Sequence, residues 1–284
     1  MRATAIVLLM TTMGCGAAAS VDDAGAGADG GANDLTATVD QAHSDQPDGD
    51  TSSADDAGVI TFYKLGIVNV SSQVSPSVNT GLSASFTDTN GTGACQRSEI
   101  GPCEITHCSA TGAIEVDSGA VTFTGGSTPE VLTHMAGGYS SLAIPATIWA
   151  PGDTVQVSAA GAAVPAWSSS VVMPEIVMLT APTLSGSPTW SRASDATFTW
   201  QGGTQTTAIF IASLTNGSAL RCDFPATALS GTVPAAALST LPPGQYLVQA
   251  RAIDRKVVSV SDWLITVAAY REIAPGSAGG VLLQ

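Results

Sequence analysis

Three cysteines lie within 14 residues of one another, and a histidine stands directly before the last of them. Thiolates and imidazole are the usual ligands of zinc, so a metal site here would use Cys95, Cys103, His107 and Cys108. The spacing lacks the Cys-x2-Cys pair that is typical of zinc sites, and an exported chain meets an oxidising compartment. The pattern therefore favours a disulfide, and we expect no metal and no cofactor.

Two pairings of these cysteines remain open. The Gly-Pro pair at 101–102 predicts a hairpin turn, which favours a disulfide between Cys95 and Cys103. A disulfide between Cys95 and Cys108 is the alternative, because sequence alone does not fix connectivity. Cys222 is far away along the chain and is expected to be a small buried hydrophobe. One of the three clustered cysteines is thus left without a predicted partner.

Residues suited to catalysis are scarce. The chain has 3 histidines, of which His107 and His134 lie beyond the N-terminal region, and it has no Gly-x-Ser-x-Gly sequence. Both histidines are interpreted as turn or strand residues. No pair of acidic residues lies in a context that predicts the buried carboxylates of a glycoside hydrolase. We therefore expect a protein that is not an enzyme.

Tryptophans offer a different kind of site. Trp200 and Trp263 lie in apolar strand-like runs and are expected in the core. Trp167 and Trp190 lie in loop-like contexts, where an exposed indole could stack on a sugar ring. These two are the candidate ligand-binding residues of an alternative function, a carbohydrate-binding surface module.

Charge is distributed very unevenly along the chain. The 284 residues include 23 Asp+Glu and 9 Lys+Arg, for a formal net charge of -14, which makes nucleic acid a poor partner. Ten aspartates and no Lys, Arg or Glu lie between Gly16 and Gly58. Such a segment cannot bury enough apolar surface to fold, so residues 15–58 are predicted to form a disordered tether.

The first residues have the pattern of an export signal. A basic Arg2 precedes a short apolar run, and residues 1–14 are predicted to be a signal peptide. Residues 12–15 (Thr-Met-Gly-Cys) resemble a bacterial lipobox, which implies that Cys15 becomes a lipid-modified N-terminus. With Gly16 next, the resemblance implies an outer-membrane or cell-surface lipoprotein. The alternative is cleavage after the Ala-Ala-Ala run at 17–19, which would release a secreted or periplasmic soluble protein.

The remainder of the chain predicts an all-β fold. Short β-branched and aromatic runs recur between Gly, Pro, Ser and Asn, and no long helical periodicity is present. The proline-flanked stretch after Ala181 suggests a boundary, so we expect two tandem β-sandwich domains at 59–181 and 182–272. The Gly- and Ala-rich residues 273–284 are predicted to be a flexible tail.

One part of the second predicted domain carries a resemblance. Residues 241–246 (Leu-Pro-Pro-Gly-Gln-Tyr), followed by alternating apolar positions, resemble the late strand of a fibronectin type III or Ig-like domain. The resemblance implies that Tyr246 makes a tyrosine corner and that Phe198 and Trp200 lie on an early core strand.

The whole layout is similar to surface lipoproteins of Gram-negative bacteria that carry acidic tethers and β-sandwich domains. This similarity implies a non-catalytic structural or adhesive protein of the cell envelope. Its expected partners are the membrane, through the lipid anchor, and an extracellular glycan or protein.

Overall fold

The computed structural model describes residues 60–62, 64–72, 80–88, 95–108, 114–135, 138–139, 142–144, 148–213, 217–271 and 276–284. The predicted signal peptide (1–14), Cys15 and the predicted tether (15–58) lie outside the described residues. None of the helices in the described ranges is long and apolar enough to span a membrane.

The described residues form an all-β structure, as the sequence predicts, and its largest element is a sheet of thirteen strands. Ten of these follow one another across the sheet in the order β1-β4-β5-β18-β17-β20-β21-β2-β3-β11, while β6, β15 and β22 pair at its sides. The strands are β1 (Ile60–Phe62), β2 (Lys64–Ser72), β3 (Thr80–Asp88), β4 (Cys95–Ile100), β5 (Cys103–Cys108), β6 (Ile114–Glu115), β11 (Leu142–Ile144), β15 (Thr189–Trp190), β17 (Thr206–Ser213), β18 (Ser218–Pro225), β20 (Gly244–Val260), β21 (Trp263–Arg271) and β22 (Ala278–Leu283).

Three smaller sheets accompany this main sheet in the described part of the chain. Their strands are β13 (Trp167–Val172), β12 (Thr154–Ala159), β7 (Val121–Thr124) and β8 (Glu130–Leu132); β14 (Val177–Ala181), β16 (Ala196–Gly202) and β19 (Ser230–Val233); and β9 (His134–Met135) with β10 (Gly138–Tyr139). Helical structure is limited here to the short α1 (Ala235–Ser239) and a 3-10 turn at Ala226–Ala228.

The four-stranded sheet and one end of the main sheet enclose the first hydrophobic core. Alternate residues of β12 are buried against Val68 and Val70 of β2 and against β3, whose residues 82–86 are buried on both faces of the strand. We call this unit the first sandwich. Its core also contains Trp263 and Ile265 of β21, which lie more than 80 residues beyond the predicted domain boundary.

The three-stranded sheet and the other end of the main sheet enclose a second hydrophobic core. Phe198 and Trp200 of β16 are buried there, opposite Ile209 and Ile211 of β17. We call this unit the second sandwich. Its core includes Ile105 of β5, which belongs to the first predicted domain.

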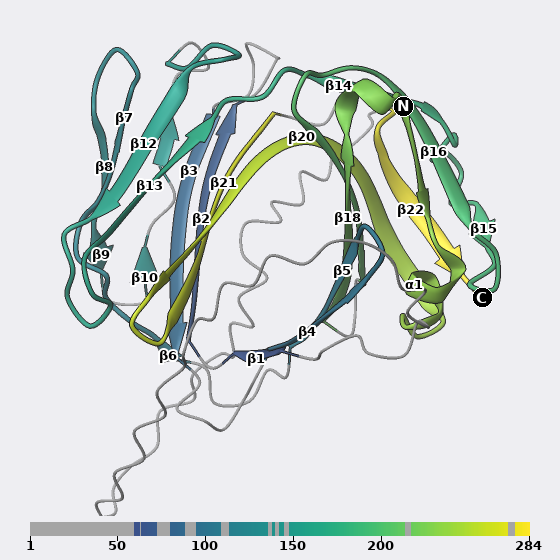
Figure 1. Ribbon diagram of the computed structural model, residues 1–284, viewed down its shortest axis with the longest axis horizontal. Helices are drawn as coiled ribbons and strands as arrows, with labels where there is room; N and C mark the ends of the chain where they lie inside the picture. The colour runs from purple at the N-terminus through teal and green to yellow at the C-terminus, as the bar shows by residue number, and fades with distance from the viewer. Residues whose placement is uncertain are drawn as a thin grey trace, which may run out of the picture.

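The two sandwiches therefore exchange strands, and each core contains residues from both sides of the predicted boundary at 181/182. The hairpin β4–β5 pairs with β18 of the second sandwich, while β21 pairs in parallel with β2 of the first. The long strand β20 runs through both sandwiches, since its first half pairs with β17 and its second half with β21. Figure 1 shows β20 bending over the top of the molecule between the two sandwiches.

Another correction concerns the C-terminal residues, which were predicted to be a flexible tail. Strand β22 pairs with β20 and β15, and its Val281 and Leu283 are buried in the second core. A Cβ atom added to Gly279 would lie 2.2 Å from the carbonyl oxygen of Leu184. The glycines at this point therefore permit close packing rather than disorder.

Tyr246 lies at the start of β20 as the resemblance implies. Its ring is fully buried, and its hydroxyl donates a hydrogen bond of 2.7 Å to the carbonyl oxygen of Pro242. A tyrosine that bonds to the backbone a few residues upstream is the defining contact of a tyrosine corner.

Candidate functional site

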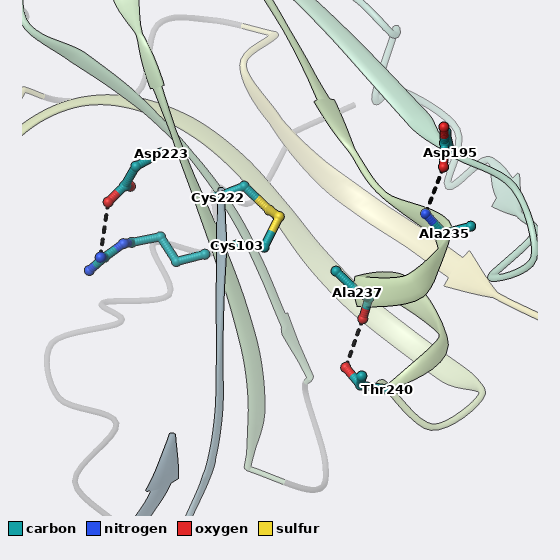
Figure 2. Close-up of a disulfide and its surroundings, with 8 residues drawn as sticks. Cys103, Asp195, Cys222, Asp223, Ala235, Ala237 and Thr240 are labelled. Atoms are coloured by element: carbon teal, nitrogen blue, oxygen red, sulfur yellow. Dashed lines mark hydrogen bonds and ion pairs between the residues drawn. A yellow bond between two sulfur atoms is a disulfide. The ribbon is translucent and has the colours of Figure 1, made fainter. Parts of the chain in front are cut away.

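The densest group of charged side chains among the described residues lies on the inner face of the main sheet. This is the face that points away from both cores. Strand alternation places neighbouring residues of β18 on opposite faces. Figure 2 shows the result: Cys222 points toward the second core, and Asp223 points to the other side of the strand.

An ion cluster occupies this inner face. One carboxylate oxygen of Glu104 accepts hydrogen bonds from Arg97 of β4, from Arg221 of β18 at 3.3 Å and from Arg255 of β20 at 3.0 Å. The four side chains are only 14–17% exposed. We call these four residues, together with Asp223, the arginine cluster. Its ion pairs are partly shielded from water, so they interact more strongly than surface pairs do.

The pair between Arg255 and Glu104 joins the two sandwiches. Arg255 lies in the half of β20 that pairs with β21, whereas Glu104 lies on the hairpin attached to β18. Figure 1 shows these parts of the main sheet on opposite sides of the bend in β20. The contact therefore crosses the inner face and ties its two sides together.

Asp223 is the second carboxylate of the cluster. One of its oxygens accepts from Arg221 at 2.9 Å, while the other is buried and has no hydrogen-bond partner among the described residues. Burial raises the pKa of Asp223, and the nearby charge of Arg221 only partly opposes this effect.

Another arginine of the inner face is held by aromatic rings. The guanidinium carbon of Arg251 lies 5.1 Å from the ring centroid of Tyr270 and 5.9 Å from that of Phe210. Burial lowers the pKa of Arg251 and raises the pKa of Tyr270. The two distances fit cation–π contacts of Arg251 with both rings, and the two pKa shifts reflect the burial of Arg251 and Tyr270.

A cavity of about 320 Å³ opens beside the arginine cluster. Thr206 of β17, Asp223 of β18 and residues 253–257 of β20 line it. It therefore lies where β20 passes from one sandwich to the other.

The cysteines depart from the predicted pairing. Cys103 forms a disulfide with Cys222, so the predicted Cys95–Cys103 bond is wrong, and Cys222 is not an isolated buried thiol. The two-residue turn at 101–102, where Gly101 has φ +57°, sets the register of the hairpin. In that register Cys95 lies directly opposite Cys108 on the neighbouring strand. Cys103 lies opposite Ile100, with its side chain on the other face of the hairpin. A Cys95–Cys108 disulfide stays a prediction.

The two candidate tryptophans do not form an exposed platform. Trp167 is 6% exposed in the first core, and its indole N–H donates to Ser118 Oγ at 3.1 Å. Trp190 is half-buried, with its ring centroid 5.7 Å from that of Phe198. Loop-like composition was misleading here because both residues begin or end short strands that cover a core.

The histidines have structural surroundings. His107 Nδ1 lies 2.9 Å from Ser218 Oγ, across the pairing of β5 with β18. His134 packs with its ring centroid 5.1 Å from that of Tyr139. Within the described ranges, no group of three or more His, Cys, Asp or Glu residues has the arrangement of a metal site.

Sequence reasoning missed the arginine cluster. A signal was present, because charged residues two apart on a strand share a face, as Arg221 and Asp223 do. The neighbouring strands in space were not predictable, however, because β4–β5 and β18 are separated by more than 100 residues. When the sequence is compared with protein-family profiles and with curated proteins, neither comparison finds a match.

Proposed function

We propose that the protein is a lipid-anchored, non-catalytic structural or adhesive module of the cell envelope. The export signal, Cys15 and the acidic segment at 15–58 support the anchor and the tether. The exchange of strands between the sandwiches carries the structural part of the proposal. A body held together in this way resists bending, which suits a module that presents a surface at a distance from a membrane.

We further propose that the second sandwich is fibronectin type III-like. Two antiparallel sheets enclose its core, with β14-β16-β19 on one side and β18-β17-β20-β22 on the other. The Tyr246–Pro242 bond and the buried Phe198 and Trp200 support this assignment. In such a domain the exchanged segment replaces the ordinary tight turn between the last two strands, β20 and β22.

Lipid labelling of the full chain in a Gram-negative host tests the anchor. We expect incorporation of labelled palmitate that Cys15→Ala abolishes and Cys222→Ala retains, because only Cys15 follows the lipobox-like residues. Mass spectrometry of the mature N-terminus separates a lipid-bearing Cys15 from an unmodified Ser20. A mature chain that begins at Ser20 would refute the anchor.

The adhesive role has a separate test. Cells that display the full chain should bind to one another or to a surface more strongly than cells that express the Cys15→Ala variant at the same level. Equal binding by the two strains would contradict an adhesive role at the cell surface.

A further inference from the structure

Cys95 and Cys108 occupy one row at the open end of the hairpin β4–β5. They lie directly opposite each other in the register of the two strands. Residues in this relation share a face of the sheet, and their Cα atoms are about 4.5 or 5.5 Å apart, depending on the type of pair. Both separations lie within the range that disulfides span. The register therefore places the two cysteines where a cross-strand disulfide can form.

The same relation produces the disulfide described above. Cys103 of β5 lies directly opposite Cys222 of β18, and these two residues are bonded. Cys103 is therefore not available to Cys95, and the cysteine opposite Cys95 is Cys108. If Cys15 carries the lipid, as the proposed function states, a bond between Cys95 and Cys108 accounts for all 5 cysteines of the chain.

A metal ion bound by the same two cysteines is the alternative chemistry. A structural zinc site has four ligands, and the sequence offers His107 as the histidine ligand. His107 is the neighbour of Cys108 on β5, so it lies on the other face of the hairpin. Its Nδ1 is 2.9 Å from Ser218 Oγ on that face. The histidine and the two cysteines are thus on opposite faces, which favours oxidation of the cysteines over metal binding.

The row of Cys95 and Cys108 lies where the chain enters the folded body. Among the described strands β1 pairs with β4 alone, and Phe62 at its end is directly opposite Cys95. β4 itself has little burial, since residues 96–100 are exposed or half-buried and only Ile100 among them packs against the second core. A strand with so few buried contacts opens easily at its free end. A covalent bond at this end would therefore secure both β4 and β1.

We propose that Cys95 and Cys108 form a second disulfide, which closes the hairpin and holds β4, and through it β1, to the second sandwich. The two thiols lose two electrons and two protons to a disulfide compound by exchange through a mixed disulfide, and that compound leaves as two thiols. Together with the bond between Cys103 and Cys222, the new bond links β4, β5 and β18 covalently in one row of strands.

Peptide mapping without reduction tests the pairing. The purified Cys15→Ala full chain is equilibrated in a glutathione redox buffer, denatured with iodoacetamide and cut after Lys, Arg and Glu. Each remaining cysteine then lies on a peptide of its own: 65–97, 100–104, 105–115 and 222–251. We expect the Cys95 peptide to be joined to the Cys108 peptide. The Cys103 peptide, joined to the Cys222 peptide, is the internal control.

Two results of this mapping would overturn the proposal. One is alkylation of Cys95 or Cys108, which would show a free thiol. The other is a bond from Cys95 to any cysteine other than Cys108. Because the mapped chain carries Cys15→Ala, neither result depends on the lipid anchor, and failure of either proposal leaves the other standing.

Hydrogen exchange tests what the bond holds. In the double variant Cys95→Ser with Cys108→Ser, amides of β4 and β1 should exchange at least about tenfold faster, because the end of the hairpin is released. Gln96→Ser is the matched control, since Gln96 is exposed on β4 beside Cys95, and it should exchange like the unchanged protein. Unchanged exchange of β4 and β1 in the double variant would overturn the proposed role. Equally faster exchange of β12 would also overturn it, because the bond would then stabilise the whole body and not this end of the hairpin.

Discussion

Two segments pass from one sandwich to the other: the hairpin β4–β5, and the second half of β20 with β21. These two segments are attached in different ways. The β20–β21 segment contributes Trp263, Ile265 and Val267 to the first core and pairs with β2 over residues 65–72. The hairpin β4–β5 contributes few fully buried apolar side chains to the second core, chiefly Ile105 and the disulfide-bonded Cys103. One segment is thus held by hydrophobic burial, and the other by a covalent bond and the arginine cluster.

This difference follows from where the apolar residues fall. The residues of β21 at positions 263, 265, 267 and 269 are all buried in the first core, so burial of that face supplies enough free energy to hold β21 in the first sandwich. β5 has charged or polar residues at alternate positions, which face the arginine cluster instead of a second apolar layer. A short strand with one modest apolar face needs another source of attachment, and the bond between Cys103 and Cys222 provides it.

The largest expected effect comes from breaking the hydrophobic attachment. Trp263→Ala removes a side chain that is 3% exposed and packs near Phe86, so it should lower the free energy of unfolding by about 3–5 kcal/mol. Urea denaturation followed by circular dichroism measures this loss. Val257→Ala, on the exposed part of β20, is the control and should change stability by less than about 0.5 kcal/mol. A Trp263→Ala loss as small as that of the control would mean that β21 is not held by burial.

Breaking the covalent attachment should lower the free energy of unfolding by somewhat less. Replacement of both Cys103 and Cys222 by alanine opens a loop with a sequence separation of 119 and should destabilise the protein by about 2–4 kcal/mol. Hydrogen exchange gives the sharper readout. Amides of β5 should exchange faster while those of β12, in the first sandwich, keep their protection. Uniform loss of protection in both strands would show that the hairpin is not attached separately.

The third expected effect concerns the charges beside this disulfide. Glu104→Gln leaves Arg97, Arg221 and Arg255 close together with one carboxylate fewer, and should destabilise the protein by about 1–3 kcal/mol. Added salt should reduce the loss by screening the repulsion between the arginines. Denaturation at low and high ionic strength measures both effects. Glu175→Gln is the matched control, since Glu175 is exposed and lies outside the arginine cluster. A loss that does not change with salt would indicate a packing defect instead of repulsion.

The parts of this comparison that sequence could predict are local. The short β-branched and aromatic runs identify the all-β fold, and the Gly-Pro pair at 101–102 identifies the hairpin turn. The residues 241–246 identify the contact made by Tyr246. Each of these depends on residues that are close together in the chain.

The exchange of strands was not predictable in this way. A strand pattern specifies which face is buried but not which strand lies alongside, so β21 alternates in the same manner whichever core it enters. The Cys103–Cys222 bond and the arginine cluster both depend on the pairing of β5 with β18. As long as that pairing is unknown, neither the disulfide nor the arginine cluster can be derived from the spacing of cysteines or charges.

The smallest expected effect concerns the carboxyl group of Asp223 in the arginine cluster, and it depends on pH. Burial raises the pKa of Asp223 above its ordinary value of 3.8, so the folded protein holds this proton more tightly than the unfolded chain does. The carboxyl therefore favours folding at low pH and loses that contribution as pH rises from 3.8 through the folded-state pKa. Asp223→Asn should remove this slope and change stability at pH 7 by less than about 1 kcal/mol.

Denaturation of both proteins between about pH 3 and pH 7 measures the difference. Asp195→Asn is the control for a carboxylate that caps α1 and lies away from the cluster, accepting from the Ala235 N–H at 2.7 Å. A slope that becomes less steep only in the Asp223 variant would assign the effect to burial beside Arg221. If Asp223→Asn instead lost stability mainly as pH rose, the ion pair with Arg221 would outweigh burial, and charge would hold the hairpin more firmly than proposed.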